Sequence, residues 1–123
     1  MRVGDAAAVT RAFTAEDVAD YLALGGAPVA DGLVPEPLIG ALWSYLLGVK
    51  LPGLGTNYLK QETEYLSDAR IGEALSARVG ITRLRPDKHL VDLETVCHAP
   101  DGRLVARGRA LVYVEDVADV MEA

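Results

Sequence analysis

The chain has 123 residues, half of them hydrophobic, and a formal net charge of −6 at pH 7. This length suits one domain with one core, and the apolar content excludes a disordered chain. The acidic balance argues against binding to nucleic acid or to an anionic membrane. Because Cys97 is the single cysteine and the N-terminus lacks the hydrophobic run of a signal peptide, we expect a cytoplasmic domain over residues 1–123, with no metal and no cofactor.

The first half of the chain predicts a weak strand followed by two helices. Residues 6–13 favour a short strand, although three alanines support it only weakly. Thr14 and Asp17 form a capping-box pattern that begins a helix over residues 15–24, which a Gly-Gly pair ends. After a short loop, residues 37–49 predict a helix that is apolar around most of its circumference. Such a helix is buried, so we expect it to lie at the centre of the fold.

The start and one face of this central helix carry specific signals. A residue before proline is disfavoured in the α region, so we expect Glu36 as N-cap and Pro37 as the first helical residue. Gly40, Ser44 and Gly48 recur every fourth residue and line one face with small side chains. A sheet or a second helix could approach closely along that face.

After Gly55 the hydrophobic period changes from that of a helix to the alternation of strands. Gly80 is expected at a bulge, and Asp101-Gly102 is a hairpin signal. Because short turns join most of the strands, they must be antiparallel. The pattern predicts an α+β fold in which one antiparallel sheet surrounds the central helix. The predicted strands cover residues 56–66, 74–85, 89–98 and 103–115.

Two carboxylates are candidates for catalysis. Glu36, at the start of a buried helix, could act as a general base or nucleophile, or could simply cap the helix. Asp31, in the preceding loop, could approach the same cleft or could serve as a turn residue beside Gly32.

Four further residues are candidate substrate-binding groups. Trp43 lies on the central helix, where an aromatic residue is also typical of the core. Asn57, Tyr58 and Gln61 lie on the first long strand, and strict alternation places Asn57 and Gln61 on one face and Tyr58 on the other. Gln61 could equally be structural.

Other polar groups are typical of a surface. His89 and His98 stand at strand ends, where histidines are usually exposed or hydrogen-bonded. Arg83, Arg85 and Lys88 surround a turn and could meet a phosphate group of a ligand, or could form a solvated basic turn.

Several runs of residues resemble the MaoC-like, (R)-specific enoyl-CoA hydratase family over nearly the whole chain. The runs are Leu42-Trp43-Ser44-Tyr45-Leu46-Leu47-Gly48, Leu51-Pro52-Gly53, and Tyr58-Leu59-Lys60-Gln61 followed by Tyr65. The resemblance implies a hot-dog fold, a dimer, and acyl thioesters of CoA or acyl carrier protein as substrates. It also implies a place in fatty-acid or polyketide metabolism.

The chain departs from this family where the family carries its catalysis. The family has a D-x-N-P-x-H motif after the first helix, whereas this chain has a shorter segment ending in Ala30-Asp31 and no histidine before His89. Neither family catalytic residue can be carried over. Three hypotheses follow: a hydratase or dehydratase that uses Glu36, with Asp31 nearby; a thioesterase that uses Glu36; or a non-catalytic subunit that completes the acyl pocket of an active hot-dog partner. We therefore expect a homodimer or a heterodimer.

Overall fold

The computed structural model describes residues 1–115, and its elements follow in the predicted order. A π-helical turn, η1 (Leu46–Lys50), continues the central helix, and a 3-10 turn, η2 (Pro86–Lys88), precedes the fourth strand. None of the helices in residues 1–115 is both long and apolar enough to cross a bilayer. The other elements are β1 (Ala6–Ala12), α1 (Ala15–Ala23), α2 (Glu36–Tyr45), β2 (Thr56–Tyr65), β3 (Ala74–Arg85), β4 (Leu90–His98) and β5 (Leu104–Val114).

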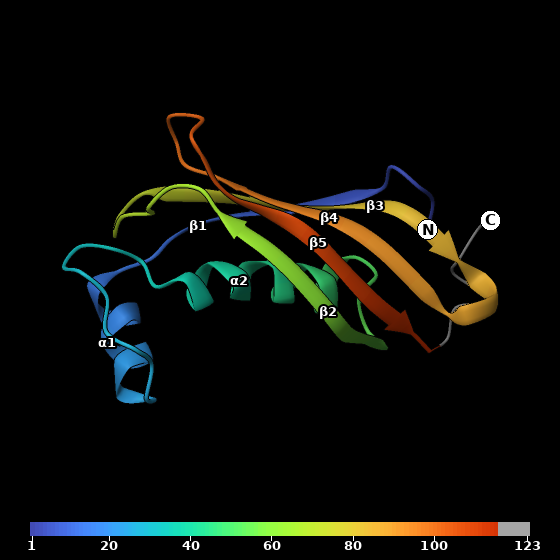
Figure 1. The fold of residues 1–123 in the computed structure, drawn as a ribbon, viewed down its shortest axis with the longest axis horizontal. Helices are drawn as coiled ribbons and strands as arrows, with labels where there is room; N and C mark the ends of the chain where they lie inside the picture. Colours follow the sequence, from blue (N-terminus) through green and yellow to red (C-terminus); the bar gives the residue numbers. More distant parts are fainter. Residues whose placement is uncertain (116–123) are drawn as a thin grey trace.

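The strands form one sheet in the order β1-β3-β4-β5-β2, with every neighbouring pair antiparallel. Figure 1 shows the sheet curving over α2, which lies along its concave side, while α1 projects from one end. The predicted α+β class and the sheet around a central helix are therefore confirmed. The strands β1 and β2 are the two edges.

The core lies between the concave face of the sheet and one side of α2. Alternate residues of the strands point inward, as their period-2 pattern predicted, and the helix contributes one apolar stripe. Leu38 of the central helix is only partly buried, although it packs against the core. The helix residues Leu42 and Leu46 are buried, as are the strand residues Val79, Leu93 and Val112.

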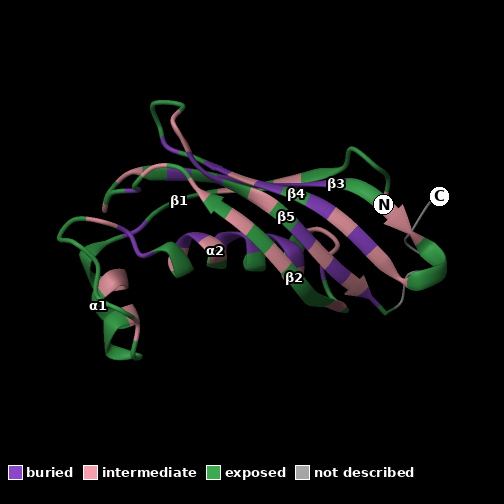
Figure 2. Cartoon of the chain, viewed as in Figure 1, coloured by how far each residue is buried: buried purple, intermediate pink, exposed green. Residues whose placement is uncertain are grey.

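The opposite side of the central helix is open, which corrects the expectation that the helix would be covered all round. Tyr45 keeps 45% of its surface exposed and Val49 keeps 59%. Figure 2 shows the buried colour confined to the side of α2 that faces the sheet. In the described residues, a Cβ built at Gly40 meets only the Tyr65 hydroxyl, 3.8 Å away, and one at Gly48 meets nothing within 4 Å. No sheet or helix formed by residues 1–115 packs closely on the small-residue face.

The predicted local signals in α1 and in the last hairpin are confirmed. The Thr14 hydroxyl accepts a hydrogen bond from the Asp17 N–H at 3.1 Å, and the Asp17 carboxylate accepts one from the Thr14 N–H at 2.9 Å. The hairpin closes with the Ala99 N–H donating to the Arg103 carbonyl at 2.9 Å. Gly102 adopts φ +87°, which a residue with a Cβ rarely tolerates.

The N-cap of α2 is Pro35, so the expectation for Glu36 was wrong. Pro35 has φ −57° and ψ 139°, an extended conformation, and Glu36 is the first helical residue with Pro37 second. Pro37 is tolerated at this position because it stands in the first turn, where its missing N–H costs no hydrogen bond.

The β-bulges also differ from expectation. In β3 the register shifts between Ile81 and Arg83, whereas Gly80 remains in regular pairing. In β2 it shifts between Tyr58 and Lys60, so Leu59 is an extra residue. Tyr58 and Gln61 therefore share the inner face of β2, and the alternation that separated them was wrong.

Candidate active site

A small hollow lies beside the start of α2 and has a volume of about 180 Å³. The first turn of α2 forms one wall, and the end of β2 with the loop after it forms the other. Polar and apolar groups alternate around it, and Glu36 is the only predicted site residue among them. The lining residues are Val34, Glu36, Ile39, Tyr65, Leu66, Ser67, Asp68 and Ala69.

The Glu36 carboxylate is exposed at this hollow and is not used by the fold. In residues 1–115 no group forms a hydrogen bond or an ion pair with it, and the N-cap has no side-chain hydrogen bond either. Its place in the first turn is favourable for a negative charge, because the helix dipole is positive there. A carboxylate that no other group engages is available to accept a proton.

Tyr65 adds a hydrogen-bond donor to the same hollow. Its hydroxyl donates to the backbone carbonyl of Glu36 at 3.3 Å. Burial raises the pKa of Tyr65, and the negative charge of Glu36 raises this pKa further. The phenol therefore stays protonated at neutral pH. Sequence reasoning did not assign Tyr65 to the site, although it is one of the residues that carry the family resemblance.

The loop after β2 contributes two more polar residues that sequence reasoning missed. Ser67 donates its hydroxyl proton to the Leu104 carbonyl at 2.9 Å, which fixes the loop to β5. Asp68 is exposed and brings a second carboxylate to the hollow. No motif or spacing marks either residue, because their place beside Glu36 depends on long-range contacts of this loop with the segment before α2, such as the Val34–Ala69 hydrogen bond and the Leu33–Arg70 bridge.

Asp31 and Trp43 lie elsewhere. Asp31 is an exposed residue of a turn in which the Leu33 N–H donates to the Ala30 carbonyl at 3.2 Å, and it does not line the hollow. Trp43 has no exposed surface, and its Nε1–H donates to the Val96 carbonyl at 3.0 Å. The structure thus gives Asp31 a turn position and Trp43 a packing role in the core.

Tyr58 and Gln61 form a polar cluster on the inner face of β2. The Tyr58 hydroxyl donates to the Gln61 side-chain oxygen, and the Gln61 amide donates to the hydroxyl of the fully buried Thr95 at 3.0 Å. Burial, with a smaller effect of Tyr65, raises the pKa of Tyr58 to about 12. Asn57 is exposed at the start of the same strand and does not join the cluster.

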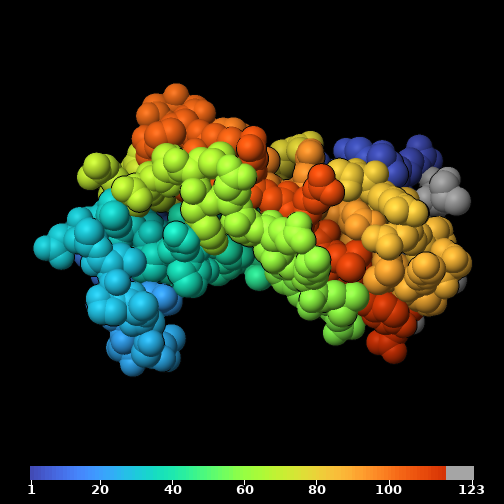
Figure 3. All heavy atoms as spheres, in the orientation of Figure 1, coloured from blue at the N-terminus to red at the C-terminus, as the bar shows by residue number. Residues whose placement is uncertain are grey.

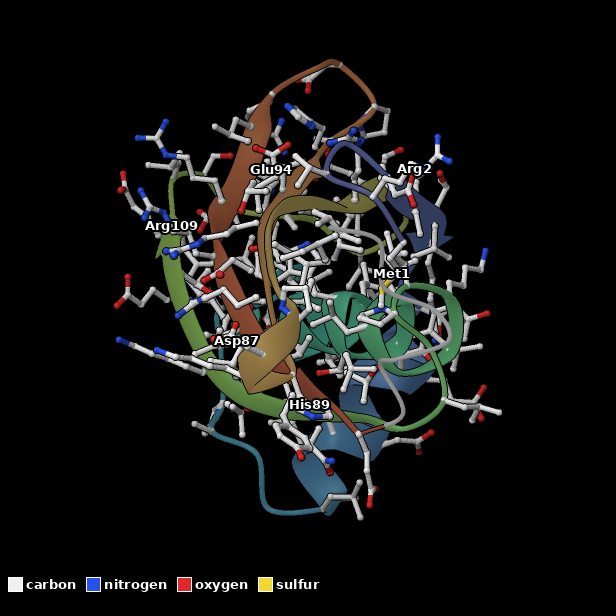
Figure 4. The ribbon with its side chains drawn as sticks, turned by 90° about the vertical axis from the view of Figure 1, so that its right-hand side faces the viewer. Met1, Arg2, Asp87, His89, Glu94 and Arg109 are labelled. Carbon is white, nitrogen blue, oxygen red and sulfur yellow. The ribbon has the colours of Figure 1, made fainter. Side chains whose placement is uncertain are left out.

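Neither histidine lies at the hollow. His89 follows η2, which in Figure 1 is at the opposite end of the sheet from the start of α2; Figure 4 shows His89 at that end. Its Nδ1 lies 3.1 Å from the Val114 and Glu115 carbonyls, both acceptors, so Nδ1 carries a proton. His98 is exposed at the end of β4. The hydrogen-bonded His89 and the exposed His98 both match the expectation for histidines at strand ends.

The basic turn offers less charge than its sequence suggests. Arg85 forms a bidentate pair with Asp92, with its shortest nitrogen–oxygen distances at 2.7 Å, so Asp92 neutralises its charge.

In residues 1–115 no three His, Cys, Asp or Glu side chains are grouped closely enough to hold a metal ion.

An apolar groove of about 400 Å³ lies on the other side of α2, between that helix, α1 and β1. In Figure 3, α1 and the residues after it project from the body as a separate lobe. Charged residues stand among the lining groups, but most of these groups are apolar. The groove is lined by Val9, Arg11, Phe13, Asp17, Asp20, Tyr21, Leu24, Leu38, Ala41, Leu42 and Tyr45.

Comparisons with known proteins agree with the resemblance seen in the sequence. The chain is 30% identical to an (R)-specific enoyl-CoA hydratase of Aeromonas caviae over 130 aligned positions, covering 91% of this chain and 94% of that one. It is 34% identical to a 3-hydroxybutyryl-CoA dehydratase of Methylorubrum extorquens, covering 72% of this chain but 54% of that one. The (R)-hydratase structure from A. caviae has a TM-score of 0.86 at 31% identity, over 94% of this chain and 98% of that chain.

Two further observations limit the similarity to these relatives. No family model matches the chain. The 130 aligned positions with the A. caviae hydratase exceed the 123 residues of this chain, so the relative carries residues that have no counterpart here. The identity and coverage nevertheless show that this chain belongs to the MaoC-like, (R)-specific enoyl-CoA hydratase family of hot-dog proteins.

Proposed function

We propose that this protein adds water to α,β-unsaturated acyl thioesters, and removes it from the 3-hydroxyacyl products, with Glu36 in place of the usual Asp/His pair. The observation that carries the proposal is the unengaged Glu36 carboxylate at a hollow beside α2. Family membership supports the class of reaction, because the relatives are named as a hydratase and a dehydratase acting on CoA thioesters.

One carboxylate is sufficient for the proton transfers. Glu36 accepts a proton from water as the water oxygen bonds to Cβ of the enoyl group, and the electrons of the double bond move toward the thioester oxygen. The resulting enolate takes a proton at Cα from the protonated Glu36, which restores the carboxylate. Tyr65 stays protonated, and we assign its hydroxyl as the donor to the thioester oxygen, where negative charge develops; to do this the hydroxyl proton must turn away from the Glu36 carbonyl, to which it donates in the free protein.

The apolar groove between α1, α2 and β1 lies across α2 from the hollow, so it is our candidate for the distal end of an acyl chain long enough to pass the first turn of the helix. Phe13, Leu38 and Leu42 are among the residues that line it. Burial of a methylene group contributes about 0.8 kcal/mol, so such a groove favours an acyl chain over a polar substituent. The carrier, CoA or acyl carrier protein, would remain outside.

We further propose that the protein works as a dimer in the cytoplasm. Strand β2 pairs only with β5 among the described residues, so its outer edge is free. Large apolar side chains surround that edge and the open face of α2, and water contact with such a patch is unfavourable. They are Tyr45, Val49, Leu54, Tyr58 and Leu59. Either a second copy or another hot-dog chain would cover them. The cytoplasmic location rests on the lone, unpaired Cys97.

Mass spectrometry of thioesters incubated with the purified protein tests the reaction. A trans-2-enoyl-CoA should gain one water and keep its CoA, and a 3-hydroxyacyl-CoA should lose one water. Release of free CoA from a saturated acyl-CoA would instead identify a thioesterase, since an exposed carboxylate can also direct water to a thioester carbonyl. If none of the three thioesters changes, the result contradicts the proposed reaction and favours the non-catalytic subunit, for which copurification with a second hot-dog chain would then be the test.

A further inference from the structure

We propose that Arg103 is a positioning residue for the Glu36 site. It lies at the start of β5, outside the hollow, and holds the loop between β2 and β3 that forms one wall of the hollow. The inference rests on the proposed function for its catalytic consequence, but its structural part can be tested without turnover.

The guanidinium of Arg103 binds the loop at three points. Its Nε–H donates to the Ser67 hydroxyl at 3.2 Å, and its Nη2 donates to the Asp68 carbonyl at 2.9 Å. The same Nη2 contacts the Glu73 carboxylate at 3.1 and 3.2 Å. Ser67 and Asp68 both line the hollow, so Arg103 fixes two of its wall residues directly.

Arg103 itself is held by the hairpin that precedes it. Its N–H donates to Asp101 Oδ1 at 2.9 Å, and its Nη1 donates to Asp101 Oδ2 at 3.1 Å. The Gly102 N–H donates to the Ala99 carbonyl at 3.0 Å, which tightens the turn. The guanidinium therefore projects from a closed turn and has little freedom to follow a moving loop.

Backbone contacts connect this loop to the residues just before α2. The Ala69 carbonyl accepts a hydrogen bond from the Val34 N–H at 2.8 Å, two residues before Glu36. Leu33 and Arg70 form an isolated antiparallel bridge beside it. A shift of residues 66–73 would move both walls of the hollow, and displacements of about 1 Å can lower a rate about a hundredfold.

All three nitrogens of the Arg103 guanidinium donate hydrogen bonds, and only an arginine can do this. A guanidinium offers a planar fork with five N–H groups, whereas a lysine ammonium is a single point of charge. Arg103→Lys would keep the attraction to Glu73 but could not reach Ser67, Asp68 and Asp101 together. This substitution therefore separates geometry from charge.

The test compares Arg103→Lys and Arg103→Gln with Arg107→Gln. Arg107 lies on β5, four residues after Arg103; its side chain is 58% exposed and has one ion pair, to Glu64 at 3.7 Å, so it is a suitable control. Hydrogen exchange of single amides would be followed by NMR, together with kcat and KM for a trans-2-enoyl-CoA. In both Arg103 variants we expect the Val34 amide to exchange about tenfold faster or more while the β3 and β4 amides keep their rates. We also expect kcat to fall about ten- to a hundredfold, with a smaller change in KM.

Unchanged exchange at Val34 in a folded Arg103 variant would overturn the proposal, as would an equal acceleration of all amides, which indicates a general effect on stability. Unchanged kcat despite faster Val34 exchange would also overturn it. If both Arg103 variants fail to fold, Glu73→Gln loosens the loop from the other side and is held to the same criteria. Absence of turnover in the unmodified protein would contradict the proposed function, whereas the exchange measurement would still decide whether Arg103 holds the loop.

Discussion

The Gln61 amide on β2 donates a hydrogen bond to the Thr95 hydroxyl on β4 at 3.0 Å, although β5 lies between the two strands. The contact is possible because Gly108 on β5 pairs with both Thr63 and Thr95 and has no side chain. A Cβ built at Gly108 would lie 1.9 Å from the Glu62 carbonyl oxygen and 2.9 Å from Gln61 Nε2. The missing side chain thus lets the edge strand bind a buried residue two strands away.

Gly108→Ala should therefore destabilise the protein. The clash with the Glu62 backbone cannot be relieved by rotating a side chain, so β2 must move away from β5. We expect a loss of about 1–3 kcal/mol in the free energy of unfolding, as for overpacked sites. Denaturant unfolding would measure it. Gly48→Ala is the control, because a Cβ there meets nothing within 4 Å and the residue is helical, so the stability should stay the same or rise by up to about 1 kcal/mol.

The Gln61–Thr95 hydrogen bond can be measured by a double-mutant cycle with Gln61→Leu and Thr95→Val. Gln61→Leu removes the donor to Thr95 and also the acceptor of the Tyr58 hydroxyl, whereas Thr95→Val removes one of three acceptors of the Gln61 amide, so Gln61→Leu should cost more. A buried polar group left without a partner costs about 1–3 kcal/mol. The double variant removes both groups, so its loss should be smaller than the sum by about 0.5–1.5 kcal/mol. Additive losses would show that the two side chains do not interact in solution.

Glu36→Gln should lower turnover of a trans-2-enoyl-CoA by about a hundredfold or more, because it removes the proton acceptor. The melting temperature should stay nearly constant, since no described group bonds to this carboxylate. Asp31→Asn is a suitable control, as Asp31 lies in a turn away from the hollow. Full activity in a folded Glu36→Gln protein would remove Glu36 from the mechanism.

The raised pKa of Tyr58 predicts a loss of stability in strong alkali. The tyrosine ionises near pH 10 in an unfolded chain but at about pH 12 in the folded one, because burial disfavours the phenolate. Between these values the unfolded state has released a proton that the folded state still holds, so the free energy of unfolding falls as pH rises. Tyr58→Phe should reduce this fall between pH 10 and 12 in urea titrations. The same slope in both proteins would contradict the pKa shift.

The free edge of β2 predicts an association that a charge would disrupt. Leu59→Asp places a carboxylate on an apolar residue that is 55% exposed at that edge. Light scattering at micromolar concentration should show the unmodified protein as a dimer and the variant as a monomer. Val3→Asp is the control, because Val3 is similarly exposed but precedes β1, the other edge strand. A monomeric unmodified protein would contradict the dimer proposal.

Local sequence signals predicted most of the fold. The Thr14–Asp17 capping box and the Asp101-Gly102 hairpin depend on residues close in sequence, and both form as expected. The bulges did not follow from sequence, because a bulge depends on the register between two strands: it falls at Leu59 and after Ile81, whereas Gly80 pairs regularly.

The candidate site was only partly predictable, for a related reason. Glu36 could be found because a proline and an apolar helix mark its position. Tyr65 and Asp68 reach the same hollow through long-range contacts with the start of α2, the Tyr65–Glu36 and Val34–Ala69 hydrogen bonds, which the linear sequence does not reveal. Trp43 was predicted to bind substrate but packs in the core, where its indole donates to the Val96 carbonyl of β4. An aromatic residue on an apolar helix gives the same sequence pattern in both roles.

The bulge at Leu59 gives β2 one spare residue. Tyr58 pairs with Val112 and Lys60 with Leu111, so the chain could lose Leu59 without any other residue of the strand changing its partner or its face. The inward row of Thr56, Tyr58, Gln61, Thr63 and Tyr65 would then follow an unbroken alternation. The same loss from the bulge-free pairing of β1 with β3 would turn every residue beyond it to the opposite face. Tolerance to a one-residue deletion thus differs between the two edges of the sheet, independently of side-chain chemistry.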